Sequence, residues 1–245
     1  MPDSLSIAEM HRGIRLGVQQ VDANFLDGLL PEEIDFYLNE TIREFVKARY
    51  SGRTADGRGF EQSEERVNDL RPLFIKDAEV STLYAGSPVT GFHVDRAVFP
   101  ENYLFLVSHR SAVQYQRTVS TPWPSTIGQQ RTLASGVTES KVFNRKAQSD
   151  HIYRLLEDPY NTTWYKQPLV DVNEDFINVY TDEHFVVTDV ILNYVRKPAV
   201  VDNNLNDPGE SVDCDLPGHV HNEIVRMTVR NIVFHLRQLH TQQQS

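Results

Sequence analysis

The sequence predicts an α+β fold, in which N-terminal and C-terminal helices are packed together and a mostly antiparallel β region is inserted between them. Apolar residues recur every three or four positions near both ends of the chain, which indicates amphipathic helices there. Between these ends, runs rich in Val, Ile, Tyr and Phe are typical of strands. Strand and helix do not alternate regularly, which argues against a doubly wound parallel sheet or a TIM barrel.

Three helices are expected before the β region. The second begins with Pro31, which suits the first helical position, and runs to about Tyr50. The third is short and stops near Arg71, because the residue before Pro72 disfavours helical geometry. The first, residues 6–20, is predicted by apolar side chains at helical spacing and weakened by two glycines (Ile7, Met10, Ile14 and Val18; Gly13 and Gly17).

Strands account for most of the middle of the chain. They are predicted at residues 73–84, 92–99, 103–119 and 141–147, with the most convincing strand pair at 176–181 and 184–195. A helix over the first half of 103–119 is the alternative for that segment. One short helix interrupts the strands, with Ser149 or Asp150 as its expected cap and Pro159 as its expected stop.

This order suggests two regions within one structural unit. Residues 1–72 together with 215–245 form the expected helical region, and residues 73–214 form the expected β-rich region with long loops. Residues 120–136 are rich in Pro, Gly, Ser and Thr and show no apolar period, so we expect an extended loop or arm there.

Charge and composition restrict the class of protein. The net charge is −10 over 245 residues, whereas a nucleic-acid-binding surface normally shows a basic excess. The single cysteine, Cys214, excludes a disulfide within the chain and a cysteine-rich zinc site, and it suits a reducing compartment. The N-terminus lacks an apolar core of signal-peptide length, and no apolar run reaches the length of a membrane span. We therefore expect a soluble intracellular product without membrane contact.

The stretch DLPGHVHNEIVRMTVRNIVFHLRQLH, residues 215–240, raises the question of a metal site. His219, His221 and Glu223 are potential ligands within five residues. Two histidines two apart point about 200° apart on a helix, unlike the ligands of an HExxH motif. The apolar pattern that follows is helical, so we expect a helix N-terminus that packs, and no metal ligand, cofactor-binding residue or catalytic residue is assigned. Cys214 has no basic neighbour in the sequence and is expected to be a free thiol.

Aromatic residues in two predicted loops are the interface candidates: Trp123, between two prolines, and Tyr160, Trp164 and Tyr165 in the segment around NTTWYKQP. Trp and Tyr are enriched in interface hot spots. Anchoring of the loops to the core is an equal alternative. Stacking on single-stranded nucleic acid is a third interpretation, which the acidic balance weakens.

Five segments spread in order over most of the chain carry a resemblance to a known family: FLDGLLPEEIDFYLNETIREFVKARY (25–50), GFEQSEERVNDLRPLFI (59–75), HIYRLLEDPYNTTWYKQPLV (151–170), VILNYVRKPAVV (190–201) and CDLPGHVHNEIVRMTV (214–229). Together they resemble the ring proteins, or head-to-tail connector (adaptor) proteins, of tailed bacteriophages, in particular those of crAss-like phages. The resemblance implies a virion protein that is made in the host cytoplasm and has no catalytic residues.

The same resemblance implies the partners. Such proteins assemble as homo-oligomeric rings, commonly of twelve copies, beneath the portal protein, and they dock the next tail ring or tail component. They continue the channel through which genomic DNA passes without sequence-specific binding. An acidic wall would suit such a channel, because attraction to phosphates would slow the passage of DNA.

Three alternatives stay open at this stage. The chain could be another non-enzymatic virion part, such as a stopper, tail-tube or decoration protein. It could be a metal-dependent hydrolase that uses His219, His221 and Glu223 with a distant acid. It could be a nucleic-acid-binding module with Trp123 and Trp164 as stacking platforms.

Overall fold

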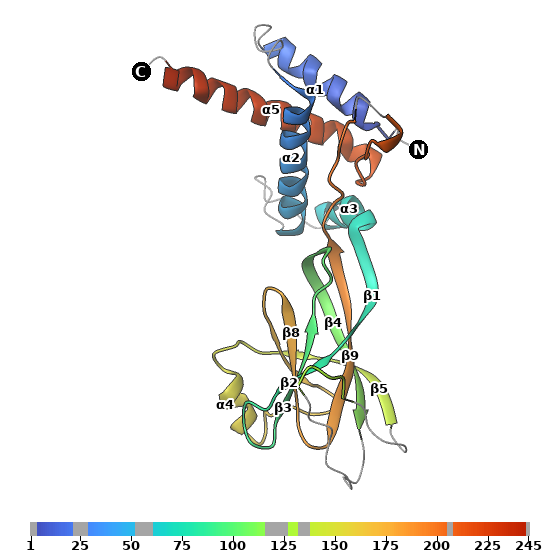
Figure 1. The fold of residues 1–245 in the computed structure, drawn as a ribbon, viewed down its shortest axis with the longest axis vertical. Helices are drawn as coiled ribbons and strands as arrows, with labels where there is room; N and C mark the ends of the chain where they lie inside the picture. The colour runs from blue at the N-terminus through green and yellow to red at the C-terminus, as the bar shows by residue number, and fades with distance from the viewer. Residues whose placement is uncertain are drawn as a thin grey trace. The chain divides into compact units, whose positions relative to one another are not determined.

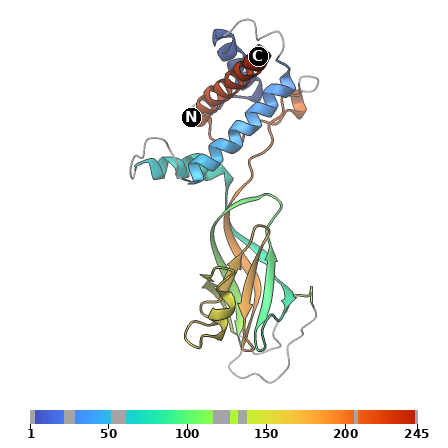
Figure 2. The same cartoon turned by 90° about the vertical axis from the view of Figure 1, so that its left-hand side faces the viewer.

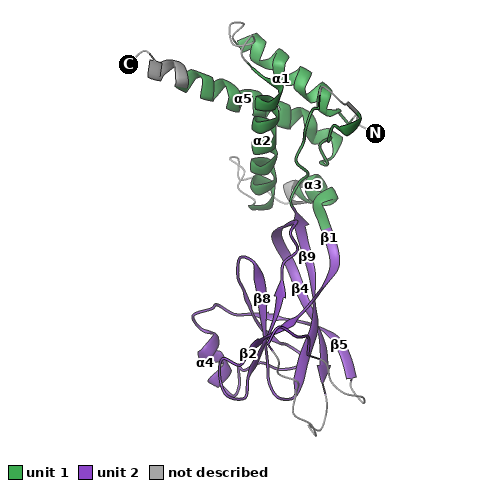
Figure 3. Cartoon of the chain, in the orientation of Figure 1, with its two compact units in different colours: residues 1–74, 197–245 green, residues 75–196 purple. Residues whose placement is uncertain are grey.

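The computed structural model describes residues 4–21, 29–51, 61–115, 127–131, 138–204 and 208–243. It divides into two compact units, residues 1–74 with 197–245 and residues 75–196 (Figure 3). Helices lie at both ends of the chain and antiparallel-rich sheets lie between them, so the predicted α+β class is confirmed. The finer expectations, a boundary near residues 72 and 215 and a single structural unit, stay predictions. None of the described helices is long and apolar enough to cross a membrane.

The first unit is helical. Its elements are α1 (Ile7–Val21), α2 (Pro31–Ser51), α3 (Glu61–Leu70), two 3-10 turns (Arg71–Leu73 and Pro208–Glu210) and α5 (Gly218–Gln243). Each of these α-helices was predicted within a few residues, except that α5 continues into the tail expected to follow it. Glu33 accepts a hydrogen bond from the Leu30 backbone N–H at 2.9 Å, which fixes the start of α2.

The terminal helices α1 and α5 pack together, as predicted (Figure 1). Two glycines on α1 face α5 in this contact. A Cβ added to Gly17 would lie 2.7 Å from Val229 Cγ2, and one added to Gly13 would lie 3.2 Å from Val225 Cγ1. The glycines therefore allow a close approach of two helices. They weaken the helical propensity of α1 but serve its packing.

Helix α2 packs on α5 through its apolar stripe, which includes Ile34, Leu38, Ile42, Phe45 and Val46, all buried. The loop that precedes α5 is held to α2 by Asn39. Its amide accepts a hydrogen bond from the Val201 backbone N–H and donates one to the Val201 carbonyl, both at 2.9 Å. These two hydrogen bonds hold the described residues of the predicted loop 201–218 against the helices.

The second unit is built on two sheets. One has the order β1-β9-β4-β5 and the other the order β2-β3-β8-β7-β6. The pairs β4–β5, β4–β9, β2–β3, β3–β8 and β7–β8 are antiparallel and β6–β7 is parallel. The bounds are β1 (Phe74–Ser81), β2 (Leu83–Gly86), β3 (His93–Val98), β4 (Tyr103–Tyr115), β5 (Thr138–Phe143), β6 (Arg145–Lys146), β7 (Leu169–Val172), β8 (Phe176–Thr181) and β9 (Phe185–Arg196).

The strand predictions were mostly right but need four corrections. The segment predicted as one strand at 141–147 falls partly in β5 and partly in β6, which lie in different sheets. The segment predicted as one strand at 73–84 is two strands in different sheets, joined at Thr82. The Thr82 hydroxyl donates to the Val187 and Thr188 carbonyls, which fixes the crossing point. The predicted pair 176–181 and 184–195 forms strands β8 and β9, but these lie in different sheets and are not paired with each other. Strand β7 was not predicted.

Apolar side chains of both sheets meet in one core, which includes Val113, Ile177, Val179, Val187 and Leu192. The other face of the second sheet is covered by α4 (Ile152–Glu157), through Ile152 and Leu156 (Figure 2). The expected helix cap is wrong: the residue before α4 is His151 and makes no side-chain cap. Ser149 instead donates its hydroxyl hydrogen bond to Asp171 at 2.7 Å.

Candidate interaction surfaces

The histidine pair at the start of α5 serves packing. His219 Nε2 lies 2.8 Å from Asp69 Oδ1, and Arg49 Nε lies 2.9 Å from Asp69 Oδ2. The Arg49 guanidinium also donates to Glu223 at 2.7 Å. Asp69 is buried, so its charge requires these partners. The four side chains connect the ends of α2 and α3 to the first turns of α5.

His221 is fully buried and both of its ring nitrogens are used. Nε2 donates to the Leu216 carbonyl at 2.9 Å, and Nδ1 accepts from the Leu5 backbone N–H at 3.1 Å. This arrangement requires a neutral imidazole with its proton on Nε2. Binding a metal would break one of these bonds.

A hydrolase built on this stretch therefore has little support. His219 and His221 bond to different groups, and Glu223 is engaged by Arg49. No group of three or more potential ligands that could hold a metal occurs in the part of the chain that the structure describes. Burial raises the pKa of the Cys214 thiol to about 11, so this thiol stays protonated near neutral pH and is a poor nucleophile.

The aromatic candidates differ in their exposure. Trp123 lies outside the described residues. Tyr160 is 93% exposed on a turn fixed by Asp158, which accepts a hydrogen bond from the Tyr160 backbone N–H at 2.9 Å. Trp164 is 51% exposed. Tyr165 stacks on Tyr115, with ring centroids 4.4 Å apart, and packs against the core.

Tyr160, Trp164 and Tyr165 form what we call the aromatic turn, and the stacking of Tyr165 on Tyr115 fixes it to the core. Trp164 meets Tyr165 edge to face at 5.1 Å, so the anchored ring supports the exposed one. Tyr160 and Trp164 therefore fit an interface, whereas Tyr165 fits the alternative of core anchoring.

The segment expected as an arm, residues 120–136, is described only at residues 127–131, and that part is held to the β unit. The Gly128 N–H donates to the Tyr84 carbonyl at 2.8 Å, and the Tyr84 N–H donates to the Gln129 carbonyl at 2.9 Å. Arg131 Nε and Nη2 donate to the two carboxylate oxygens of Asp95 at 2.8 and 2.7 Å. Both side chains are 1% exposed.

This buried ion pair was missed by the sequence analysis. Asp95 lies on the strand β3 face that points into the core between the sheets, where an unpaired carboxylate would be costly. Arg131 also donates to the Thr181 hydroxyl at 2.6 Å. Burial, and then the positive charge of Arg131, lower the pKa of the neighbouring His93. Nothing local in the sequence connects residues 95 and 131, so only an acidic residue within an apolar strand could have raised the question.

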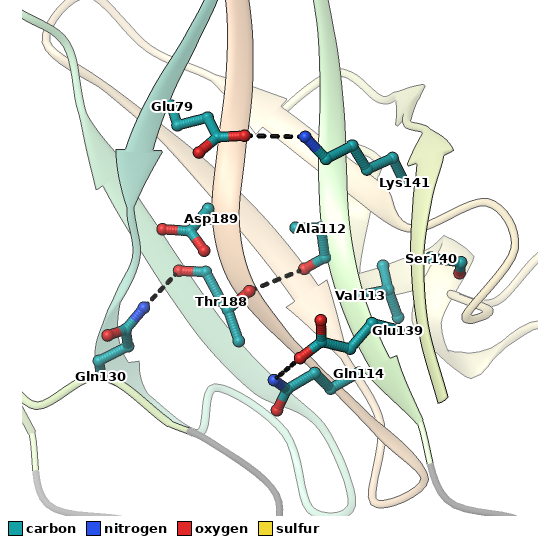
Figure 4. A pocket seen from close by; sticks show the side chains of 10 residues that line it. All are labelled: Glu79, Ala112, Val113, Gln114, Gln130, Glu139, Ser140, Lys141, Thr188 and Asp189. Carbon is teal, nitrogen blue, oxygen red and sulfur yellow. Dashed lines mark hydrogen bonds and ion pairs between the residues drawn. The ribbon is translucent and has the colours of Figure 1, made fainter. Parts of the chain in front are cut away.

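A shallow pocket of about 510 Å³ lies on the first sheet of the β unit (Figure 4). Most of its polar side chains bond to one another, to backbone or to Ser81. Lys141 pairs with Glu79 at 2.8 Å, Gln114 donates to Glu139 at 2.6 Å, and Gln130 donates to the Thr188 carbonyl at 2.9 Å. Among the described residues, the lining contains neither a histidine nor a cysteine beside Ser140. This arrangement provides no activated nucleophile.

Comparison with known proteins gives the class. The model of the family described as phage tail ring protein 3/4 matches residues 31–244, and so spans both units. The match defines a structural component of a phage tail. The chain belongs to the phage tail ring protein 3/4 family of crAss-like phages. No curated protein matches it.

Proposed function

We propose that the chain forms an oligomeric ring at the phage head–tail junction, bound beneath the portal and extending the DNA channel. The observation that carries this proposal is the family match over residues 31–244, which includes the helical unit and the β unit. Ring assembly requires each copy to offer two unlike surfaces, one for each neighbour. The portal protein and the next tail ring or tail component are the further partners. The virion is the proposed location, after synthesis in the host cytoplasm.

The exposed aromatic turn is the proposed contact surface toward a neighbouring protein. Tyr160 and Trp164 present large aromatic area from a turn that Asp158 and Tyr165 hold in place. Preorganised aromatic side chains lose little conformational freedom on binding. Trp123, which lies outside the described residues, belongs to the same proposal as a candidate from the sequence.

Passage of DNA agrees with the charge of the chain. A net charge of −10 repels phosphate and gives no basis for a tight, sequence-independent grip on DNA. A non-catalytic role is supported by the protonated Cys214, the engaged His221 and the internally paired pocket on the first sheet. A stopper, tail-tube or decoration protein is the alternative within the same structural class.

Native mass spectrometry tests the proposal. The purified chain is measured alone and mixed with the portal protein from the same genome. A closed ring of many copies, or capture of many copies by the portal, is expected. A chain that stays monomeric and ignores the portal contradicts the position beneath the portal and favours another place in the virion.

A further inference from the structure

Helix α5 carries an apolar groove with arginines along it, on the face turned away from α2. Asn231 and His235 mark the side toward α2, since Asn231 Nδ2 lies 3.3 Å from Thr41 Oγ1 and the His235 ring lies 5.7 Å from the Tyr37 ring. The groove is centred roughly 150° around the helix from that side, at 100° per residue. Its volume is about 380 Å³. We call it the arginine groove, and it is lined by Val21, Arg226, Val229, Arg230, Val233, Phe234 and Arg237.

The groove is unusual for this chain in charge and in exposure. Residues 224–243 contain three arginines and no Asp or Glu, although the chain as a whole has a net charge of −10. Phe234 is 60% exposed and Val21 is 48% exposed. Neither Arg226 nor Arg230 makes an ion pair within the described ranges. Large apolar side chains with cations beside them favour an acidic apolar partner.

A surface with the complementary chemistry lies on α2. Phe36 is 65% exposed, opposite the buried stripe of that helix. Glu32 and Glu40 lie four residues before and after it, so all three occupy one face. Both glutamates are exposed, and neither makes an ion pair in the described part of the chain. We call these three residues the Phe36 ridge.

The spacing of charges on the two surfaces agrees. Glu32 and Glu40 are separated by about 12 Å along α2, at about 1.5 Å per residue. Arg230 and Arg237 are separated by about 10.5 Å along α5, by the same measure, with Val233 and Phe234 between them. When the acids of the ridge meet these arginines, Phe36 lies at the apolar centre of the groove.

The two surfaces also suit a ring. Both belong to the helical unit, and they lie on faces of α2 and α5 that point away from the contact between these helices. A copy therefore cannot close this contact on itself but can offer one surface to each neighbour. Contacts between unlike patches continue from copy to copy until a ring closes.

We propose that the arginine groove of one copy receives the Phe36 ridge of the next copy, and that this contact joins the ring. The inference rests on the proposed ring assembly and assigns its helical contact surface. The occupant is a second copy of this chain, because the ridge combines the acidic charge, the apolar centre and the spacing that the groove requires.

Reversing the charges of the groove and of the ridge, each in the full-length chain, tests this contact. The groove variant carries Arg230→Glu and Arg237→Glu, and the ridge variant carries Glu32→Arg and Glu40→Arg. Native mass spectrometry over a range of concentrations, with and without the portal protein, measures assembly. Each variant alone is expected to associate at least tenfold more weakly than the unmodified chain, because two attractive pairs become repulsive. Far-UV circular dichroism is expected to show unchanged helix content, since all four positions are exposed.

Mixing the two variants gives the decisive readout. The acidic groove of the first fits the basic ridge of the second, and the reverse pair also fits, so an equal mixture is expected to restore rings that contain both chains in alternation. A matched reversal at exposed Arg71, Arg71→Glu, is expected to assemble normally.

Three results would overturn the proposal. The first is normal rings from either variant alone, which would leave the ring itself intact but place its contacts elsewhere. The second is failure of the mixture to assemble. The third is a groove variant that keeps the ring but loses salt-dependent DNA binding, which would make nucleic acid the partner of the groove. An unmodified chain that forms no ring, even with the portal, contradicts the proposed function as well.

Discussion

The buried pair of Asp95 and Arg131 allows a quantitative prediction about the β unit. Replacing Arg131 by Met removes three charge-assisted hydrogen bonds, two to Asp95 and one to Thr181, and leaves a carboxylate that is 1% exposed without its cation. Removing one partner of a buried ion pair costs about 3–5 kcal/mol. We expect the free energy of unfolding of the β unit to fall by that amount.

The double variant Arg131→Met with Asp95→Val is expected to recover most of the loss. Two apolar side chains in place of a buried pair are often neutral in stability. A residual loss of about 1–2 kcal/mol is expected, because the Thr181 hydroxyl loses a partner. Lys141→Met is the control, since the Lys141–Glu79 pair is exposed and such pairs contribute about 0–1 kcal/mol.

Urea unfolding followed by tryptophan fluorescence measures these changes. Both tryptophans of the chain, Trp123 and Trp164, belong to residues 75–196, so their fluorescence reports on the β unit. A loss under 1 kcal/mol for Arg131→Met would refute the reasoning. So would a double variant that is as unstable as the single one.

Three further predictions follow from packing, burial and exposure. Gly17→Ala is expected to destabilise the helical unit by up to about 2 kcal/mol in thermal unfolding followed by circular dichroism, since overpacking against Val229 costs about 1–3 kcal/mol and helical propensity returns about 1. Gly13→Ala, with its longer contact, should be neutral or stabilising, and the reverse order would contradict the packing. Burial lowers the pKa of His109, so the unfolded chain takes up a proton that the folded chain does not as pH falls below about 6.5. The unmodified chain should therefore lose more stability than His109→Gln between about pH 7.5 and 5.5, and equal losses would argue against this sign. Trp164→Ala should leave the fold intact but weaken ring or portal association about tenfold or more, and unchanged association would remove Trp164 from the interface.

Local signals predicted most of the helices and strands. Pro31 and the apolar stripe of α2 predicted that helix to within a residue at each end. The spacing of His219 and His221 and the helical apolar pattern after them predicted a helix N-terminus there, and α5 begins at Gly218. Both elements depend on residues that are close in the sequence, so a local pattern is enough to predict them.

Contacts between distant residues account for what sequence could not predict. Thr82 switches the chain between sheets because its hydroxyl reaches β9, a partner that the period of residues 73–84 does not reveal. Gly13 lowers the helical propensity of α1, but it allows α1 to approach Val225 of α5 closely. The ion pair of Arg131 with Asp95 spans 36 residues without a local motif. The arginine groove was visible only as a run without acidic residues at the end of an acidic chain.

The most direct test of ring assembly at the head–tail junction is an electron cryomicroscopy map of the virion in which this chain is traced. We expect a closed ring of copies around the tail axis beneath the portal, with DNA passing through the centre and α2 of each copy against α5 of the next. Absence of the chain from the virion, or its presence away from the axis, would contradict the proposed function.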